Sequence, residues 1–448
     1  MRKKSLLSGA LILTGAGIIC RCLGVVFRIP FANIVGNYGI GLYQLVFPLY
    51  SLLLIVSSAG IPVAIAKMVA RVRDDPRQCH RILFNALMAL LVIGAVITGL
   101  FLALAGQLAT WQGQPDIWPL YLAIAPAVFF VCVISALRGF FQGLNNMVPT
   151  AVSQIVEQVV KVGVALGLVF WLVNISTLWA VFGAVLAVSI SELIAMVVLI
   201  VIYFVKRQKS PAATKPTIPD KLFSWRLIKS IFVTAAPIMV MSLAFPLVQL
   251  FDSFFIVNAL QSHGINNATE LYGIASGAVH TLINLPTVVG VAIATVLLPM
   301  VSRCFRQKEQ RVWQKKVTLS LWLTLAFGVA VAAGLALFPE WILQLLYQRT
   351  FAGKPEELAT AVLLLRIESF AVVLICLTQV VSAVLQGIDH ARWPMWALIV
   401  GGVAKVILEI VALPWWGIMV VSIANVLCYA LALVISGVAL IRFWHQRQ

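Results

Sequence analysis

The feature that most constrains this chain is a series of twelve apolar stretches, each long enough to cross a lipid bilayer as one helix. A membrane-spanning helix needs about 20 mainly apolar residues, because the hydrocarbon layer is about 30 Å thick. The stretches lie at roughly 6–27, 39–68, 82–105, 117–137, 149–171, 177–205, 228–257, 271–302, 316–338, 357–386, 393–413 and 417–442. The 448 residues are 62% hydrophobic and 10% charged, which excludes a soluble globular domain. The sequence therefore predicts an all-α, polytopic membrane protein.

The positive charges predict how these spans are oriented. Most of the 32 Lys and Arg residues fall in segments that share one side of the membrane, whereas only Arg28, Arg349 and Lys354 fall in segments on the other side. Because cytoplasmic loops carry the excess of Lys and Arg, we expect both termini in the cytoplasm. The net charge of +17 does not indicate nucleic-acid binding, since the charges lie in short loops between apolar stretches.

An internal repeat divides the spans into two halves. The signature Gln142-Gly143-Leu144-Asn145 precedes Lys161, and Gln386-Gly387-Ile388-Asp389 precedes Lys405 in the same register, since 386 − 142 and 405 − 161 both equal 244. A repeat at a fixed offset indicates two structurally similar halves. The basic, proline-containing stretch 206–227 is the expected linker between a six-helix lobe at 1–205 and a second at 228–448. An even number of spans in each half predicts parallel repeats, related by an axis along the membrane normal.

Polar side chains follow one face of the stretch at 149–171. Gln154, Glu157, Gln158 and Lys161 recur at helical spacing, and Glu157 and Lys161 form an i,i+4 pair in the favourable order. The stretch at 393–413 contains a similar pair of oppositely charged residues four positions apart, Lys405 and Glu409. Ionisable groups at this depth are costly and mark functional sites, so we expect these residues to line a polar cavity. The alternative is that each lysine is neutralised by its helix neighbour and serves packing alone.

Further candidates lie in the first, seventh and eighth stretches. Arg21 in the first stretch and Arg28, seven residues later, share a helix face, and arginine binds phosphate bidentately. Asp252 in the seventh stretch has three interpretations: a partner of Arg21 across a central cleft, a ligand for a coupling cation, or one side of an ion pair between helices. His280 and Asn284 add a polar stripe to the eighth stretch.

The sequence contains no arrangement typical of catalysis or of cofactor binding. The seven cysteines show no CxxC pair and no Cys/His spacing of a metal site, and no Gly-rich phosphate loop occurs. We therefore expect a protein that is not an enzyme and that needs no metal, no other cofactor and no ATP-binding domain of its own.

Three segments carry a resemblance to a known family. GIGLYQLVFPLYSLLLIVSSAGIPVAIAKMVA at 39–70, LRGFFQGLNNMVPTAVSQIVEQVVKV at 137–162 and LYGIASGAVHTLINLPTVVGVAIATVLLPMVSR at 271–303 resemble the stage V sporulation protein B family. That family is part of the multidrug/oligosaccharidyl-lipid/polysaccharide (MOP) flippase superfamily and is related to the lipid II flippases. The resemblance implies a V-shaped pair of six-helix lobes, as in MATE transporters and lipid II flippases, and alternating access. Many relatives carry fourteen helices, whereas twelve stretches occur here, so the binding mode of the lipid tail stays open.

The resemblance also implies a function. We expect a flippase in the bacterial plasma membrane that moves a polyprenyl-pyrophosphate-linked oligosaccharide from the inner to the outer leaflet. The leading substrate is the peptidoglycan precursor lipid II, with sporulation as one setting and cell-wall synthesis enzymes as partners beside membrane lipids. Related flippases place arginines of the first span in a cationic central cavity, and Arg21 and Arg28 match that pattern. The predicted cationic site is therefore formed by Arg21, Arg28, Lys161 and Lys405.

Two other functions stay open from the sequence. A cation-coupled exporter of drugs or organic cations belongs to the same superfamily and would use acidic residues in the cavity, for which Asp252 is the candidate. A membrane glycosyltransferase or polymerase would need carboxylates on the outer side, where Glu340, Glu356 and Glu357 form the only cluster.

Overall fold

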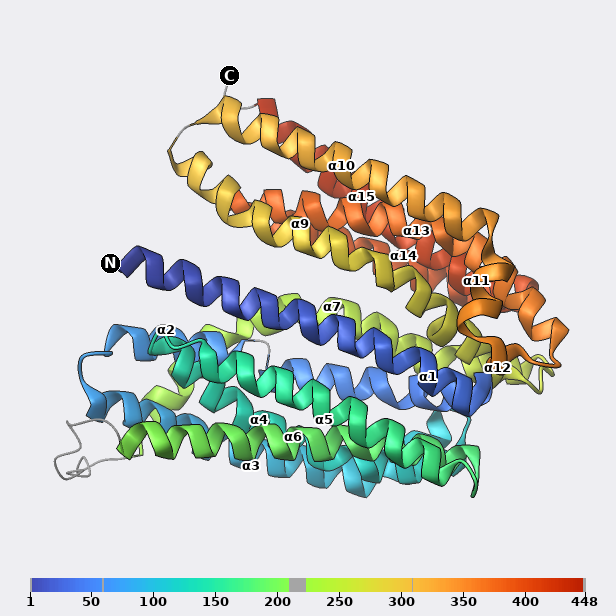
Figure 1. Cartoon of the computed structure of the whole chain (residues 1–448), viewed down its shortest axis with the longest axis horizontal. Coiled ribbons are helices and arrows are strands. Elements are labelled where there is room, and N and C mark those ends of the chain that lie inside the picture. The colour runs from blue at the N-terminus through green and yellow to red at the C-terminus, as the bar shows by residue number, and fades with distance from the viewer. Residues whose placement is uncertain (1, 59, 209–222, 308, 446–448) are drawn as a thin grey trace. The chain divides into compact units, whose positions relative to one another are not determined.

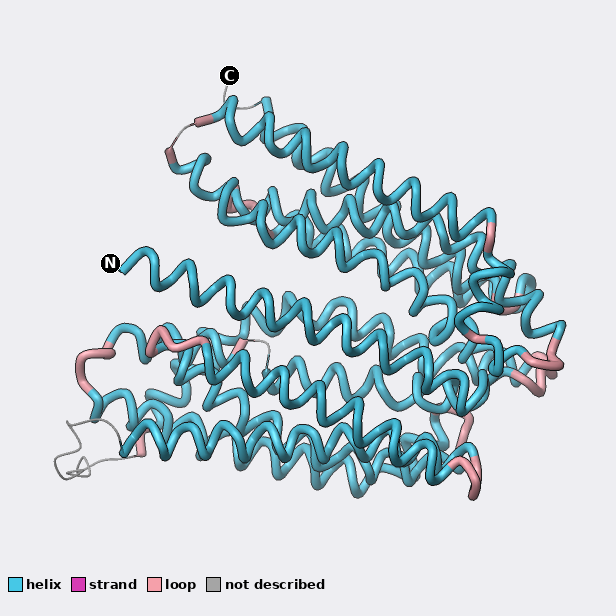
Figure 2. Tube along the Cα trace, viewed as in Figure 1, coloured by secondary structure: helices cyan, strands magenta, loops and turns pink. Residues whose placement is uncertain are grey.

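The computed structural model describes residues 2–58, 60–208, 223–307 and 309–445 (Figure 1). Over these residues every regular element is helical, as Figure 2 shows. Ten helices of the described chain are long and apolar enough to cross a membrane. The all-α, multi-pass architecture predicted from the sequence is therefore confirmed. Residues 209–222 of the predicted linker lie outside the described residues, so the lobe boundary at 206–227 stays a prediction.

The first helix, α1, runs over Arg2–Ser58 and contains the first predicted span and part of the second. The two parts meet at Gly36, whose backbone angles are φ 68° and ψ −177°. This conformation is open to glycine because it has no Cβ atom, and it interrupts the helical hydrogen-bond ladder. A single glycine thus divides 57 residues of continuous helix into two segments.

The described chain forms two compact units. Unit 1 comprises residues 1–27 and 46–246, and unit 2 comprises residues 28–45 and 247–448. Two helices, α1 and α7 (Trp225–Ser262), contribute residues to both units. Residues 28–45 of α1, which follow the first predicted span, therefore belong with the C-terminal half of the chain.

Unit 1 is built around α4, which carries buried residues on nearly every face. Its helices are α2 (Ile61–Arg71), α3 (Pro76–Trp111), the 3₁₀ turn η1 (Pro115–Ile117), α4 (Trp118–Gly143), α5 (Val148–Leu172) and α6 (Thr177–Gln208). Leu137 and Phe141 of α4 lie in one apolar cluster with Ile65, Leu83 and Ala195. Between membrane-spanning helices such side chains stabilise the unit by van der Waals packing, because lipid tails are as apolar as they are.

Unit 2 has α13 as its central helix. Its elements are α8 (Ala268–Tyr272), the π-helix η2 (Gly273–Val279), α9 (His280–Arg306), α10 (Gln310–Leu337), α11 (Pro339–Leu346), α12 (Gln348–Phe351), α13 (Pro355–Gly387), α14 (Arg392–Trp416) and α15 (Met419–His445). Val380 and Val384 of α13 share an apolar cluster with Val301 and Leu440. π-Helices are uncommon and often occur at functional sites, and η2 directly precedes His280.

The sequence repeat has the same backbone geometry in both units. Asn145 has φ 60° and Asp389 has φ 64°. The amide of each residue donates to the carbonyl three residues earlier, at 2.9 and 3.2 Å, and the next amide donates to the carbonyl five residues earlier. This hydrogen-bond pattern is a Schellman motif, which ends α4 and α13. The two signatures therefore place Lys161 and Lys405 at corresponding positions of α5 and α14.

Candidate functional site

Unit 1 holds a polar cluster centred on an arginine of α4. Arg138 Nη2 donates to Glu157 Oε2 of α5 at 2.8 Å, and Arg138 Nε donates to Ser153 Oγ at 3.0 Å. The side chains of Arg138 and Glu157 are 17% and 15% exposed, so this pair is largely buried. Glu157 therefore has an ion-pair partner on another helix, and the pair with Lys161 on its own helix stays a prediction. Lys161 is half-buried on α5.

Arg138 is absent from the site residues predicted from the sequence, because it directly follows the apolar stretch 117–137. In the structure α4 continues to Gly143, which places Arg138 inside the helix. The sequence did contain a signal: Arg138 lies four residues before Gln142 of the repeat signature. In a helix that continues past residue 137, this spacing of one turn places the two side chains on the same face.

A second carboxylate of unit 1 is buried without a cation one helical turn away on its own helix. Glu192 of α6 is 4% exposed, and Tyr50 Oη of α1 donates to its Oε1 at 3.3 Å. Glu157, Arg138 and Lys161 interact with Glu192 electrostatically. These five residues form the unit 1 cluster.

The other predicted residues of unit 1 lie near this cluster with smaller contacts. Gln154 and Gln158 are half-buried on α5, and Cys20 Sγ of α1 donates to the carbonyl oxygen of Gln154 at 3.4 Å. Arg21 follows Cys20 on α1 and is exposed. Arg21 belongs to unit 1, whereas Arg28 belongs to unit 2.

In unit 2, the α1 segment 28–45 packs closely against α8 and η2. A Cβ atom at Gly41 would collide with the carbonyl group of Thr269, and one at Gly273 would collide with the carbonyl oxygen of Asn37. Small residues at such positions let two helix backbones approach within a membrane. Gln44 Nε2 also donates to the carbonyl oxygen of Ser276 in η2. These contacts fix the segment that carries Arg28.

Arg28 opens onto a pocket in unit 2. Arg28 Nη1 donates to Thr281 Oγ1 of α9 at 3.1 Å. The pocket is small and open: its cavity volume is about 20 Å³, within an empty volume of about 300 Å³ that includes open solvent, and Tyr43, Gln44 and Tyr347 contribute to its lining. Burial raises the pKa of Tyr347, which lies between α11 and α12, to about 12. Its hydroxyl group is therefore neutral near pH 7 and can donate a hydrogen bond.

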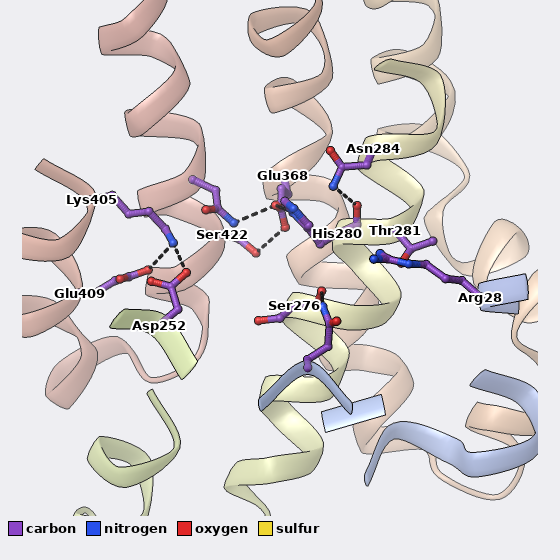
Figure 3. A network of polar contacts seen from close by, with 12 residues as sticks. Arg28, Asp252, Ser276, His280, Thr281, Asn284, Glu368, Lys405, Glu409 and Ser422 are labelled. Atoms are coloured by element: carbon purple, nitrogen blue, oxygen red, sulfur yellow. Dashed lines mark hydrogen bonds and ion pairs between the residues drawn. The ribbon is translucent and has the colours of Figure 1, made fainter. Parts of the chain in front are cut away.

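Lys405 lies between two carboxyl groups in unit 2, as Figure 3 shows. Lys405 Nζ donates to Asp252 Oδ2 of α7 and lies 3.3 Å from Glu409 Oε1 on its own helix. Lys405 is 4% exposed and Glu409 is 0% exposed. Of the three interpretations of Asp252, the ion pair between helices is the one present in the structure. We name these three residues the Lys405 triad.

Glu368 of α13 is the acceptor for groups from two neighbouring helices. It takes hydrogen bonds from Asn425 Nδ2 at 2.9 Å and from Ser422 Oγ at 3.3 Å, both on α15. His280 Nδ1 of α9 lies 3.2 Å from Glu368 Oε1 (Figure 3). The predicted residue Asn284 donates to the carbonyl oxygen of His280 at 2.9 Å, within its own helix. His280 is thus a partner of Glu368, a carboxylate whose contacts the sequence did not reveal.

Within the described residues, no group of three or more His, Cys, Asp or Glu side chains is arranged to hold a metal ion. The candidate site therefore consists of polar clusters with internal ion pairs and of the pocket at Arg28. Such an arrangement can bind an anionic headgroup or a proton.

Comparisons with known proteins agree with the resemblance found in the sequence. The family model described as polysaccharide biosynthesis protein matches residues 6–305, and the model described as MatE matches residues 237–411. The uncharacterized membrane protein YabM of Bacillus subtilis is 31% identical over 91% of this chain and 74% of its own length. Stage V sporulation protein B of the same organism is 28% identical over 92% of this chain and 78% of its own length. The predicted family resemblance is thereby confirmed.

A flippase and a solved structure extend these similarities. The lipid II flippase MurJ of Bacillus subtilis is 26% identical over 90% of this chain and 77% of its own length. An inward-facing structure of a multidrug resistance MATE family transporter of the MOP superfamily matches with a TM-score of 0.77, at 15% identity. That match covers 98% of this chain and 100% of the other. It shows a shared fold, which confirms the predicted MATE-like class.

Proposed function

Because this chain belongs to the polysaccharide biosynthesis protein family, within the MOP superfamily of membrane transporters, we propose that it is a flippase for a lipid-linked oligosaccharide. Such a protein carries a polyprenyl-pyrophosphate-linked glycan from the inner to the outer leaflet. The substrate presents a doubly anionic pyrophosphate and a set of sugar hydroxyl groups to the protein. It therefore needs cationic donors and neutral polar groups at one place in the membrane.

The observation that carries the proposal is the pocket at Arg28. A guanidinium group has five N–H donors in a planar fork, and Arg28 uses one of them on Thr281. Arg28 lines a pocket together with Tyr43, Tyr347 and Gln44. Arginine binds phosphate oxygens bidentately. We assign the pyrophosphate to Arg28, with the tyrosines and Gln44 as its neutral partners.

The other predicted cations have different parts in this proposal. Arg21 is exposed on the unit 1 portion of α1 and is a second candidate donor to the headgroup. Lys161 lies beside the Arg138–Glu157 pair and, with Gln154 and Gln158, is assigned to the sugars. Lys405 is already bound to two carboxyl groups, so we assign it to charge balance within unit 2.

Lipid II is the substrate that the relatives favour. One relative bears the name lipid II flippase and another the name stage V sporulation protein. The peptidoglycan precursor is therefore the first glycan to test, with spore formation as one setting and cell-wall synthesis enzymes as partners. The proposal places both termini in the cytoplasm and the chain in the bacterial plasma membrane, in keeping with the distribution of Lys and Arg.

A translocation assay tests the proposal. Purified full-length protein is reconstituted into vesicles with fluorescent lipid II in both leaflets, and a membrane-impermeant quencher reports the fraction that becomes accessible with time. The expected result is translocation that depends on the protein and does not occur for a phospholipid with a similar fluorophore. Absence of translocation for lipid II and for other polyprenyl-pyrophosphate glycans would overturn the proposal.

One observation favours a second candidate, an exporter of organic cations. The MatE family model matches residues 237–411, which include Asp252 and Glu409. Organic cations need carboxylates that are free to pair with them, whereas Asp252 and Glu409 share Lys405. A drug-susceptibility screen of cells with wild type and with Asp252→Asn separates the candidates, since only an exporter would lose resistance.

A further inference from the structure

The charges of the Lys405 triad do not balance if all three groups are ionised. Asp252 and Glu409 would contribute two negative charges, and Lys405 one positive charge. Asp252 is 8% exposed, Lys405 4% and Glu409 0%. A net charge buried in a membrane-spanning region is costly. One bound proton would make the triad neutral.

The geometry of the two carboxyl groups also requires a proton. Asp252 and Glu409 lie within hydrogen-bonding reach of each other, and two carboxylates have only acceptor atoms. A hydrogen bond between them exists when one of the two carries a proton, as in carboxyl pairs that share a site. Among the described residues, Asp252 Oδ1 and both Glu409 oxygens have no well-formed hydrogen bond from another donor. Glu409 is fully buried and is directed at Lys405 (Figure 3).

Among the described residues, Lys405 is the cation within ion-pair distance of Asp252 and of Glu409. Lys405 and Glu409 lie on α14 and Asp252 on α7. Titratable groups that interact with the triad include Tyr272 on α8, and Cys428 and Tyr429 on α15, with Glu368 of α13 beyond Tyr429. None of these groups is positively charged near pH 7. A bound proton is therefore the group that neutralises the excess negative charge of the triad.

We propose that Asp252 and Glu409 bind one proton between them beside the fixed charge of Lys405, and that this proton is the coupling ion of transport. A carboxylate oxygen takes the proton from water and returns it to water when the triad opens, so the step involves no other reactant. The Lys405 ammonium lies in contact with both carboxyl groups, so the site already holds a positive charge of its own. The coupling role rests on the proposed function, whereas proton binding does not.

Infrared spectroscopy of the purified full-length protein tests proton binding without any substrate. A protonated carboxyl group has a C=O stretching band that disappears when the group ionises. The proposal predicts that Glu409→Gln and Asp252→Asn each remove the same component of this band. Each substitution leaves one carboxylate opposite one ammonium, so the remaining group ionises. A group protonated by burial alone would keep its band when the other carboxyl is replaced, and that result would overturn the shared proton.

Glu357→Gln is the matched control for this measurement. Glu357 lies in the same unit, and its side chain is 16% exposed. One of its oxygens binds Lys354 at 2.8 Å and the other accepts from Asn37 at 2.6 Å. Both oxygens of Glu357 accept from donors that are not carboxyl groups, so we expect Glu357→Gln to leave this component of the C=O band unchanged. Equal helical content by circular dichroism ensures that the three variants are compared as folded proteins.

Transport under imposed gradients tests the coupling role. Vesicles that translocate fluorescent lipid II are given either a pH gradient or a Na⁺ gradient. We expect the pH gradient to change the initial rate several-fold in wild type and not in Glu409→Gln, and the Na⁺ gradient to have no effect. A rate that follows Na⁺ alone would overturn the coupling. If no glycan is translocated at all, the proposed function fails, and the infrared result still decides whether the proton is bound.

Discussion

Asn145 and Asp389 lie 244 residues apart and adopt the same left-handed backbone conformation, with φ 60° and φ 64°. Each ends a central helix of its unit and precedes the helix that carries an intramembrane lysine. Asn and Asp are the residues that tolerate this conformation best after glycine. The sequence repeat is therefore a repeat of a structural motif, and it sets the register of Lys161 and Lys405.

Replacing Asn145 with valine tests this helix end. A β-branched residue in the left-handed region costs about 1–2 kcal/mol, so Asn145→Val should lower the free energy of unfolding by that amount. Asn145→Gly is the control and should leave stability unchanged or slightly raised, because glycine adopts this conformation freely. Thermal unfolding in detergent measures both variants. Equal destabilisation by valine and glycine would show that the backbone angle is not the cause.

Gly41 should be essential for the packing of the α1 segment that carries Arg28. A Cβ atom at this position collides with the backbone of Thr269, and overpacking of this kind costs about 1–3 kcal/mol. Gly41→Ala should therefore lower the thermal stability of the purified protein. Gly24→Ala in the same helix is the control, since nothing lies within 4 Å of its Cβ position. A stable Gly41→Ala variant would contradict the close approach of the two backbones.

Arg138 and Glu157 should be energetically coupled. Removal of one partner leaves the other charge largely buried, so Arg138→Gln and Glu157→Gln should each cost about 2 kcal/mol or more. The double variant removes both charges and should cost less than the sum of the two, with a coupling energy of about 0.5–3 kcal/mol. A double-mutant cycle of unfolding free energies provides the measurement. Additive effects would mean that the pair contributes no interaction of its own.

Glu368 should stabilise unit 2 through its three contacts with α9 and α15. Glu368→Gln replaces one acceptor oxygen with a donor nitrogen, so one of the partners His280, Ser422 or Asn425, which are buried or half-buried, loses its acceptor. An unsatisfied buried polar group costs about 1–3 kcal/mol. Glu356→Gln is the control, because Glu356 is exposed in the first turn of the same helix. Comparable thermal unfolding of the two variants would contradict this role.

The helices and their repeat could be predicted from the sequence, because both depend on local patterns. Apolar length identifies a span, and the signature before Lys161 and Lys405 is a string of adjacent residues. Glu409 could also be placed beside Lys405, since the two are one helical turn apart. The structure places these residues as the helical spacing requires.

The contacts between helices could not be predicted in the same way. Asp252 meets Lys405 and Glu368 meets His280 because α7 faces α14 and α13 faces α9, and the facing of helices is set by packing across the whole unit. The predicted span ends at residue 137 because Arg138 is charged. In the structure the helix continues, because Arg138 forms an ion pair with Glu157 and can therefore be largely buried. The break at Gly36 and the π-helix η2 could not be predicted either, because neither changes the pattern of hydrophobic residues along the sequence.

The central claim is that Arg28 binds the pyrophosphate of a lipid-linked glycan, and translocation by Arg28 variants tests it most directly. The assay compares the initial rates of lipid II translocation by wild type, Arg28→Ala, Arg28→Lys and Arg366→Ala, at equal amounts of reconstituted protein. Arg366 is an exposed arginine of α13 and controls for the loss of one positive charge. The account predicts at least a tenfold loss for Arg28→Ala, which corresponds to about 1.4 kcal/mol. It predicts a partial loss for Arg28→Lys, because lysine cannot bind phosphate bidentately, and an unchanged rate for Arg366→Ala. Wild-type rates in Arg28→Ala would contradict the account.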